Sequence, residues 1–494
     1  MSSSRPQSRP VPRLPRGFRD TFAGDVVFRQ RMIDVIREVY ERYGFAPLET
    51  PAVEYVDALG KFLPESSTPA GGIFAFQDED NRWLALRYDL TAPLSRIFAE
   101  HRHEIPIPFR RYQIGLVWRN EKPGPGRFRE FYQFDIDTVG SASMAADAEV
   151  CCAVADSLEG LHIPRGSYLI KVNNRKALNG VLEVIGLPLD ENTSLRVLRA
   201  IDKLDRLGTE GVRQLLGEGR TDESGDFTEG AQLTADQVQR IIDLLSVKEH
   251  HRSAVCDRFA ELVSGSKVGE EGVAELRQID AFLRAAGYAE DQVIFDPTVV
   301  RGLAYYTGPV FEAHLTFEVA DEAGQKQQFG SVAGGGRYDY LVERFLGEKV
   351  PATGISIGVD RLLAALRQLG QQSLLETVAP VVVTVMDRDR VSDYQKICFQ
   401  LRKAAIPAEM YLGDGDLRKQ LQYADERGSV IAIIAGSREF EAGQVSLKDL
   451  HLGRELSKEI TERDAWVKDQ PSQVTVPTEN LIDEVKRILE RYRR

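Results

Sequence analysis

Residues 111–139 read RYQIGLVWRNEKPGPGRFREFYQFDIDTV, two β-rich runs around a centre rich in proline and glycine. The first run covers Arg111–Val117 and the second covers Arg129–Thr138. The residues between them, 119–127, are typical of a loop. This stretch therefore predicts two antiparallel strands joined by a hairpin loop, and with them a domain built on an antiparallel sheet.

One face of the second strand is polar. Side chains alternate along a strand, so one face should carry Phe131, Gln133, Asp135 and Asp137. A sheet that only packs on a core keeps one face apolar. Acidic groups and an amide beside Arg119 instead suit a small zwitterion next to a phosphate. A solvated outer face is the alternative interpretation, and this segment alone does not exclude it.

The sequence on either side of this hairpin divides into further regions. An amphipathic helix is expected over residues 24–43, because apolar residues recur there every three or four positions. β-rich sequence continues to about residue 186 and returns over residues 291–376. Residues 187–290 are charged, Leu-rich and helical in pattern, so we interpret them as an inserted helical domain. In this insertion Thr234 and Gln237 have the spacing of a capping box, which predicts a helix start.

The C-terminal residues 377–494 alternate between strand and helix patterns. Three short apolar runs, Val381–Val385, Ala408–Leu412 and Val430–Ala435, are typical of buried strands. Helical patterns lie between them, and a last helix is expected over residues 479–493. We predict a separate small α/β domain with a mostly parallel or mixed sheet.

Composition limits the kind of protein. The chain has 494 residues, too many for one compact core, with 43% hydrophobic and 28% charged residues, as in soluble globular proteins. Its longest apolar stretches are far shorter than the roughly 20 residues of a bilayer helix. A net charge of −12 argues against a protein that binds nucleic acid through a general excess of positive charge, although a local basic face could still do so.

The four cysteines, Cys151, Cys152, Cys256 and Cys398, form no CxxC pair and no set with zinc spacing. The sequence therefore indicates no disulfide framework and no metal site, and a reducing compartment fits best. The first twenty residues are rich in arginine and proline and predict a disordered tail, whose boundary with the folded chain we place at residues 14–15. An organellar transit peptide is the alternative, but the prolines oppose the amphipathic helix that it requires.

Two more segments combine arginine, glycine and aromatic residues. In Val300–Gly308, Arg301 lies between an apolar run and the pair Tyr305 and Tyr306, a setting in which arginine usually meets an anion. A tyrosine pair packed in a core is the alternative. In Gly334–Asp339 and Gly354–Arg361, successive glycines let a ligand approach the backbone, and Arg361 falls in the first turn of a predicted helix.

Together and in this order, these segments resemble the signatures of histidyl-tRNA synthetases, from about Pro15 to the C-terminus. Three segments are similar to class II motifs 1, 2 and 3, namely residues 43–51, Trp118–Asp137 and Gly354–Arg361. Residues 300–306 and 334–339 are similar to two further signatures of this family. The resemblance implies an α+β fold, with a class II antiparallel-sheet catalytic domain in two parts (15–186 and 291–376), the helical insertion (187–290) and an anticodon-binding domain (377–494).

The resemblance also implies a role for each matching residue. The residues implied to bind histidine are Asp89, Thr91 and Gln133 at the α-amino group and Asp137 and Tyr306 at the imidazole, with Tyr305 beside them. The residues implied to bind ATP are Arg119, Glu121, Phe131, Arg301 and Arg361. Among these, Arg119 and Arg301 should be catalytic at the α-phosphate. A carboxylate opposite a phenol suits imidazole, which offers a donor and an acceptor or two donors.

The implied reaction joins L-histidine to ATP, used with Mg²⁺, and then transfers histidine to the terminal adenosine of tRNA(His). Motif 1 implies a homodimer, and the implied compartment is the cytoplasm, with no membrane and no protein-bound metal. Ala304 stands where many family members carry an acidic residue. The loop Lys122–Arg127 is not the common bacterial one, which leaves open whether the extra 5′ guanosine of histidine tRNAs is read.

Two other classes of protein share such sequences. One is a regulatory paralogue that activates the phosphoribosyltransferase of histidine biosynthesis, and the other is a binding module that senses uncharged tRNA. Regulatory paralogues usually lack the anticodon domain and lose catalytic positions, whereas Arg119, Arg301 and Arg361 are all present here. The sensing modules belong to kinases, and this chain has no kinase signature. The sequence therefore favours the ligase.

Overall fold

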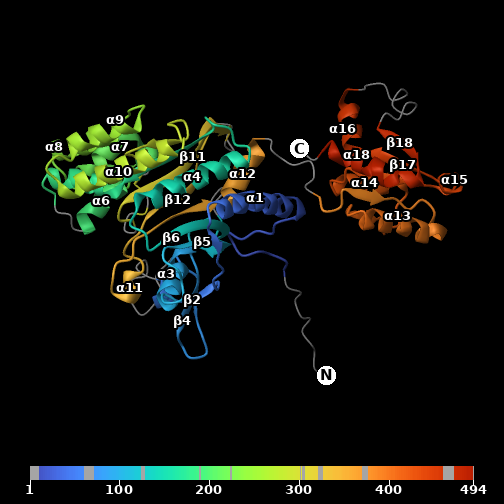
Figure 1. Cartoon of the computed structure of the whole chain (residues 1–494), viewed down its shortest axis with the longest axis horizontal. Helices are drawn as coiled ribbons and strands as arrows, with labels where there is room; N and C mark the ends of the chain where they lie inside the picture. The colour runs from blue at the N-terminus through green and yellow to red at the C-terminus, as the bar shows by residue number, and fades with distance from the viewer. Residues whose placement is uncertain are drawn as a thin grey trace. The chain divides into compact units, whose positions relative to one another are not determined.

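The computed structural model describes residues 11–59, 72–123, 128–187, 191–222, 225–300, 302, 306–320, 326–369, 377–459 and 472–492. The chain forms two compact units (Figure 1). One contains Met32–Gln368 with the N-terminal Met1–Arg19, and the other contains Leu369–Arg494, with which Asp20–Arg31 are grouped. In the described parts of the chain, no helix is long and apolar enough to span a bilayer.

The first unit is built on an eight-stranded sheet with the order β1-β5-β6-β13-β12-β11-β7-β10. All pairs from β5 to β7 are antiparallel, and only the edge pairs β1–β5 and β7–β10 are parallel, so the predicted antiparallel sheet is confirmed. The strands are β1 (Ala46–Pro47), β5 (Phe109–Trp118), β6 (Glu130–Val139), β7 (Tyr168–Asn174), β10 (Val293–Phe295), β11 (Pro309–Ala320), β12 (Lys326–Arg337) and β13 (Ala352–Gly358).

The predicted hairpin is the β5–β6 pair, in register from Phe109 opposite Val139 to Trp118 opposite Glu130. Part of its loop, residues 124–127, lies outside the described residues. The polar face of β6 is buried: Gln133, Asp135 and Asp137 are 7%, 2% and 2% exposed. The alternative of a solvated outer face is therefore wrong.

Helices cover the sheet. Figure 1 shows α4 (Met144–Gly160) lying along it, and α4 contacts β6, β7, β11 and β13. The helix begins at Ser143, whose hydroxyl accepts from the Ala145 amide, and it is buried along most of its length. Arg337 reaches α4 from the end of β12, where its guanidinium pairs with Asp147 in the core. The other helices around the sheet are α1 (Ala23–Arg42), α3 (Thr91–Glu100), α5 (Arg175–Val184) and α12 (Val359–Gln368).

The insertion is helical as predicted, with α6 (Glu191–Ile201), α7 (Leu204–Leu216), α8 (Ala235–Leu245), α9 (Arg252–Leu262) and α10 (Lys267–Ala285) at one end of the sheet (Figure 1). The capping box at Thr234 and Gln237 is present. A short hairpin of β8 (Gly219–Thr221) and β9 (Phe227–Glu229) was not predicted. Helix α10 packs on α4 and α5, with Gly269 against Gly180, so the insertion is not a separate compact unit.

Two local features were not given by the sequence patterns. The glycine run Gly334–Gly336 belongs to β12, which continues through it and pairs with both neighbours. Glycine allows this, because a Cβ on Gly335 would lie 2.1 Å from the Gly354 carbonyl oxygen. Residues just after the tail boundary that we placed at residues 14–15 also contact the first unit. The Arg129 amide donates to the Gly17 carbonyl, and Arg19 pairs with Asp360.

The second unit has a mixed five-stranded sheet, as predicted, with the order β15-β14-β16-β17-β18. Its parallel strands are β14 (Val381–Val383), β15 (Ala408–Met410) and β16 (Ile431–Ile434), and its antiparallel strands are β17 (Gln444–Asp449) and β18 (Gln473–Pro477). The helices include α13 (Val391–Lys403), α14 (Leu417–Glu426), α16 (Leu450–Glu459) and α18 (Leu481–Glu490). Only α16 and β18 in this set were not predicted.

Replacing Gly335 by alanine tests the close strand packing of the large sheet. The added Cβ would meet the Gly354 carbonyl oxygen at 2.1 Å and the Ile355 Cα at 2.6 Å. Because backbone atoms cannot move aside, we expect a loss of about 3 kcal/mol in the free energy of unfolding, measured by urea denaturation. Gly358→Ala is the matched control, since its Cβ would have only ordinary contacts at 3.5 Å or more. Equal stability of the two variants would contradict this packing.

Candidate active site

The polar face of β6 continues across the neighbouring strands of the sheet and forms the floor of the candidate site. Register places Arg111, Asp137, Gly354 and Gly336 in one row across β5, β6, β13 and β12. The Tyr306 ring lies over Gly336, because a Cβ there would meet its Cδ1 atom at 2.8 Å. Strands lie roughly 4.8 Å apart, so β6 and β12 are separated by about 10 Å. The Asp137 carboxylate leans over Gly354 in the same way, so Asp137 and Tyr306 lie on the same side of the sheet above two neighbouring glycines.

Asp137 is held from two sides. The Arg111 Nη2 atom lies 2.8 Å from Asp137 Oδ2, and the Tyr338 hydroxyl donates to Oδ1. Both Arg111 and Asp137 are inaccessible to solvent or nearly so. Burial raises the pKa of Asp137, while Arg111 and the Tyr338 hydrogen bond oppose this shift. The arginine contact does not have the angle of a hydrogen bond, so Oδ2 has no hydrogen-bond partner among the described residues.

Gln133 and Asp135 continue the same face of β6. The Gln133 Nε2 atom donates to the Ser356 hydroxyl, and its Oε1 is buried without a partner among the described residues. Its cross-strand neighbours are Gly115 and Gly358, which carry no side chains. Burial raises the pKa of Asp135 to about 7, with Arg111 opposing and Asp137 adding to the shift.

Asp89 and Thr91 lie where the chain enters α3. The Asp89 Oδ1 atom accepts from the amides of Thr91 and Ala92 at 3.2 and 2.9 Å, the arrangement of a carboxylate at a helix N-terminus. Burial raises the pKa of Asp89, and the Ala92 amide and Arg119 oppose it. Because Oδ1 is occupied, Oδ2 is the oxygen that can accept from a ligand.

The predicted ATP residues fall into two groups. Arg119 follows β5, donates from Nε to the Tyr88 carbonyl at 3.3 Å, and has its Cζ 5.2 Å from the centre of the Phe131 ring. Glu121 is exposed, and so is Arg361, which contacts the Phe329 ring and carbonyl on β12. Arg301 and Tyr305 lie outside the described residues.

The structure adds residues that the sequence patterns did not single out. Arg111 and Gln113 on β5 share the polar face with β6. Tyr338, which directly follows β12, donates to Asp137, and Ser356 of β13 accepts from Gln133. Alternation along residues 111–117 could have revealed the first two, since both are polar in an otherwise β-rich run. Tyr338 and Ser356 depend on pairing between strands far apart in the sequence, which no local pattern gives.

Polar atoms without partners gather on this face. Among the described residues, the buried side-chain atoms that lack a hydrogen bond include Arg111 Nε and Nη1, Gln113 Oε1, Gln133 Oε1, Asp135 Oδ1 and Asp137 Oδ2. Native proteins satisfy nearly all buried polar atoms. With three carboxylates nearby, namely Asp89, Asp135 and Asp137, the face suits a polar ligand with a positively charged end.

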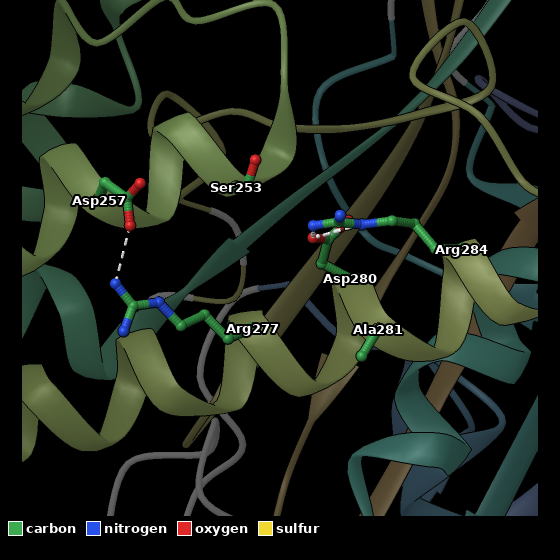
Figure 2. Close-up of a pocket in the computed structure, with 6 residues that line it drawn as sticks. All are labelled: Ser253, Asp257, Arg277, Asp280, Ala281 and Arg284. Atoms are coloured by element: carbon green, nitrogen blue, oxygen red, sulfur yellow. Dashed lines mark hydrogen bonds and ion pairs between the residues drawn. The ribbon is translucent and has the colours of Figure 1, made fainter.

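A pocket on the insertion does not compete with this site. Figure 2 shows it between α9 and α10, lined by Ser253, Asp257, Arg277, Asp280, Ala281 and Arg284. The Arg277 guanidinium lies 2.9 Å from Asp257, and Arg284 pairs with Asp280. Its arginines are thus neutralised by aspartates in the pocket, and none of the predicted site residues lines it.

An antiparallel sheet with this substrate-facing hairpin, joined to a C-terminal α/β unit, defines a class II aminoacyl-tRNA synthetase. The family model of histidyl-tRNA synthetase matches residues 17–362, and that of the anticodon binding domain matches residues 378–488. The chain therefore belongs to the histidyl-tRNA synthetase family. Residues 17–362 span both parts of the large sheet and the insertion.

Individual relatives agree over nearly the whole chain. The histidine–tRNA ligase of Cereibacter sphaeroides is 55% identical over 99% of this chain and 100% of its own length. That of Rhizobium meliloti is 56% identical over 97% of this chain and 95% of its own. The crystal structure of the Nostoc histidyl-tRNA synthetase superimposes with a TM-score of 0.75 at 31% identity, covering 97% of this chain and 100% of that one.

The raised pKa of Asp135 predicts a pH-dependent stability. Unfolded aspartate has a pKa of about 3.9, whereas that of Asp135 in the fold is about 7. Between these values the folded chain keeps a proton that the unfolded chain has released, so stability falls as pH rises through this window. Asp135→Asn removes this titration. We expect the melting temperature of the variant, relative to that of the wild type at the same pH, to rise between about pH 5 and about pH 8. A difference that does not change with pH would contradict the burial of this charge.

Proposed function

We propose that this chain is a histidine–tRNA ligase that activates L-histidine with ATP and transfers it to the terminal adenosine of tRNA(His). The observation that carries this proposal is that Asp137 and Tyr306 lie on the same side of the sheet, over the neighbouring glycines Gly354 and Gly336. A carboxylate and a phenol on one face of a sheet suit the two nitrogens of an imidazole. Amino acids without a second ring nitrogen would leave one of these buried groups unpaired.

The amino end of histidine would lie toward Gln133 and Asp89. Gln133 Oε1 and Asp89 Oδ2 are both acceptors, and an ammonium group offers three donors. Thr91, at the start of α3, adds its hydroxyl to this end of the site in our assignment. Tyr305 is assigned to the histidine side because of its place beside Tyr306 in the sequence.

Activation needs no covalent catalysis by the protein. A carboxylate oxygen of histidine attacks the α-phosphorus of ATP, the bond to the bridging oxygen breaks, and pyrophosphate leaves. Arg119 and Arg301 are assigned to the negative charge that develops at the α-phosphate, and Arg361 to the γ-phosphate. Phe131 would stack on adenine, with Glu121 at the ATP-binding loop. Mg²⁺ binds mainly phosphate oxygens and water, so we treat it as part of the ATP substrate.

In the second step a ribose hydroxyl of the tRNA attacks the histidyl carbonyl, and AMP leaves. The C-terminal unit is the proposed site for the anticodon. Its parallel strands β14, β15 and β16 end at the same edge of the sheet. Beyond this edge, Met386 and Leu412 are 45% and 84% exposed. Apolar side chains in such loops can stack on unpaired bases without a large positive field.

A regulatory subunit is the second candidate. A Bacillus halodurans chain described as an ATP phosphoribosyltransferase regulatory subunit or histidyl-tRNA synthetase superimposes with a TM-score of 0.66. At 22% identity this likeness concerns the fold alone. The arginines at positions 119 and 361 and the C-terminal unit favour the ligase. The proposed compartment is the cytoplasm, where tRNA is charged and where unpaired cysteines such as the four of this chain are stable.

We also propose that two copies of the chain associate through the small sheet of β2 (Val53–Tyr55), β4 (Trp83–Leu86) and β3 (Ala75–Gln77). Register places Tyr55, Leu84 and Phe76 in one row across this sheet. Val53, Tyr55 and Phe76 are 37%, 43% and 46% exposed. An apolar sheet face of this kind is typical of a surface that a partner covers, and the motif 1 resemblance makes a second copy the expected partner.

Phe76→Glu tests this interface. A carboxylate in the middle of an apolar interface must be buried without a partner, which costs several kcal/mol. We expect the variant to shift from dimer toward monomer by at least tenfold in dissociation constant, measured by sedimentation equilibrium. Phe227→Glu is the control, because Phe227 is 63% exposed on β9, away from this sheet. A monomeric wild type would refute the proposal outright.

The activation step is tested by histidine-dependent ATP–pyrophosphate exchange, with other amino acids as controls. We expect exchange with histidine alone. Arg119→Ala and Arg301→Ala should each lower its rate by roughly 10²–10³, the usual cost of removing one transition-state donor. Arg277→Ala serves as the matched arginine control, since Arg277 pairs with exposed Asp257 on the insertion, and it should leave exchange unchanged. Normal exchange by the Arg119 variant would refute its role.

A further inference from the structure

A short segment near the N-terminus, residues 17–19, packs against both arms of the β5–β6 loop. The Arg129 amide donates to the Gly17 carbonyl oxygen at 2.9 Å. A Cβ on Gly17 would lie 2.9 Å from the Arg129 Cγ atom and 3.3 Å from the Pro123 Cβ atom. Arg129 in turn donates from Nε to the Glu121 carbonyl oxygen at 2.9 Å. The segment therefore contacts the arm that enters the loop and the arm that leaves it.

Arg19, the last residue of this segment, also reaches the start of α12. Its guanidinium pairs with the Oδ1 atom of Asp360, and its Cζ atom lies 4.0 Å from the centre of the Phe128 ring. The other oxygen of Asp360, Oδ2, accepts from the Tyr132 amide of β6 at 2.8 Å. One carboxylate thus joins three parts of the chain, namely residues 17–19, strand β6 and helix α12.

These contacts lie beside residues that are assigned to ATP. Tyr132 directly follows Phe131, which is assigned to adenine, and Asp360 directly precedes Arg361, which is assigned to the γ-phosphate. The two assigned residues belong to segments that are far apart in the sequence, so the backbone does not set the spacing between them. The bond from the Tyr132 amide to Asp360 ties one segment to the other.

The charge of Asp360 depends on Arg19. The Asp360 side chain is 12% exposed, and a carboxylate with so little access to water needs a partner for its charge. Arg19 supplies that partner, and the face of the Phe128 ring, which attracts a guanidinium, helps to hold it. Without Arg19, an uncompensated negative charge would stand one residue from Arg361. It would oppose the binding of a triphosphate there, because like charges repel.

We propose that residues 17–19 form an N-terminal clasp that positions the two ATP-binding elements, the β5–β6 loop and the start of α12, relative to each other, with Arg19 as its positioning residue. This inference rests on the proposed function, which assigns ATP to these elements. The side chains that Arg19 contacts in the described part of the chain are Asp360 and Phe128, and neither is assigned to histidine. Loss of the clasp should therefore weaken ATP and spare histidine.

Arg19→Ala tests the clasp by measuring the two substrates separately in pyrophosphate exchange with Mg²⁺. We expect the KM for ATP to rise roughly tenfold, because Asp360 loses a charge-assisted partner and its charge opposes the triphosphate. The KM for histidine and the kcat should each stay within about twofold of their wild-type values, since Arg19 is not placed at histidine or at the reacting phosphorus. An equal rise in both KM values would mean a general loosening of the fold and would overturn the proposal.

Arg16→Ala is the matched control for this variant. Arg16 is exposed three residues earlier in the sequence, and its replacement removes the same charge from the same part of the chain. Arg16 makes no ion pair with another described residue, so the KM for ATP should stay within about twofold of the wild-type value. A rise in the KM for ATP as large as that of Arg19→Ala would show an effect of net charge alone and would contradict the clasp.

A double-mutant cycle shows whether Arg19 acts through Asp360. Asp360→Asn keeps an oxygen for the Tyr132 amide but removes the negative charge that Arg19 pairs with. In the Asp360→Asn background we expect Arg19→Ala to change the KM for ATP by less than about twofold, because the contact that it removes is already lost. The same tenfold rise in both backgrounds would mean that Arg19 acts independently of Asp360, for example by binding ATP itself, and the proposal would be wrong.

The same measurements separate failure of the clasp from failure of the proposed function. Wild-type protein without histidine-dependent exchange refutes the activity itself. Wild-type exchange, with an unchanged KM for ATP in Arg19→Ala, refutes only the clasp. The Arg19 side chain is 38% exposed, so its replacement should leave the fold intact, as judged by circular dichroism. If Arg19→Ala does not fold, Arg19→Gln takes its place with the same expected results, because glutamine keeps most of the side chain and removes the charge.

Discussion

The buried ion pair between Arg111 and Asp137 is the constraint on which the rest of the catalytic unit depends. Both side chains are almost wholly removed from water and lie directly opposite each other on β5 and β6. A buried charge is tolerated only when it is paired and hydrogen-bonded, and breaking such a pair is strongly destabilising. A shift of one residue in the β5–β6 register would put the two charges on opposite faces of the sheet. The pair therefore fixes the hairpin and, with it, the polar floor of the site.

Glycines shape the floor of the site as much as the polar side chains do. Gly354 cannot be replaced by a larger residue, since its Cβ would meet Asp137 Oδ1 at 2.0 Å. Gly336 and Gly302 lie against the Tyr306 ring in the same way. The absence of side chains at these glycines is what lets the Asp137 carboxylate and the Tyr306 ring lie close to the sheet. Burial raises the pKa of the carboxylates around the floor, and a ligand with a positively charged end restores the balance.

Local patterns were sufficient for most of the elements and for part of the site. The alternation in residues 129–138 identified the polar strand, and the Thr234–Gln237 spacing identified a helix start that the structure contains. They did not show that the three glycines Gly334–Gly336 continue a strand. They also gave no indication that Arg337, beside those glycines, serves the fold by pairing with Asp147 of α4. A glycine or arginine has several uses, and the partner that selects one lies elsewhere in the chain.

The sequence by itself determined the antiparallel hairpin, the helical insertion, the C-terminal α/β unit and the resemblance to one enzyme family, because strand alternation, helix periodicity and motif order are properties of neighbouring residues. Only the tertiary structure decided which side chains meet. Ser356 opposes Asp135, Tyr338 reaches Asp137, and the Tyr306 ring covers Gly336. Each of these pairs joins strands or loops separated by 30 to more than 200 residues. Their contact depends on sheet order and register, which pairing across the whole domain sets and no local pattern contains.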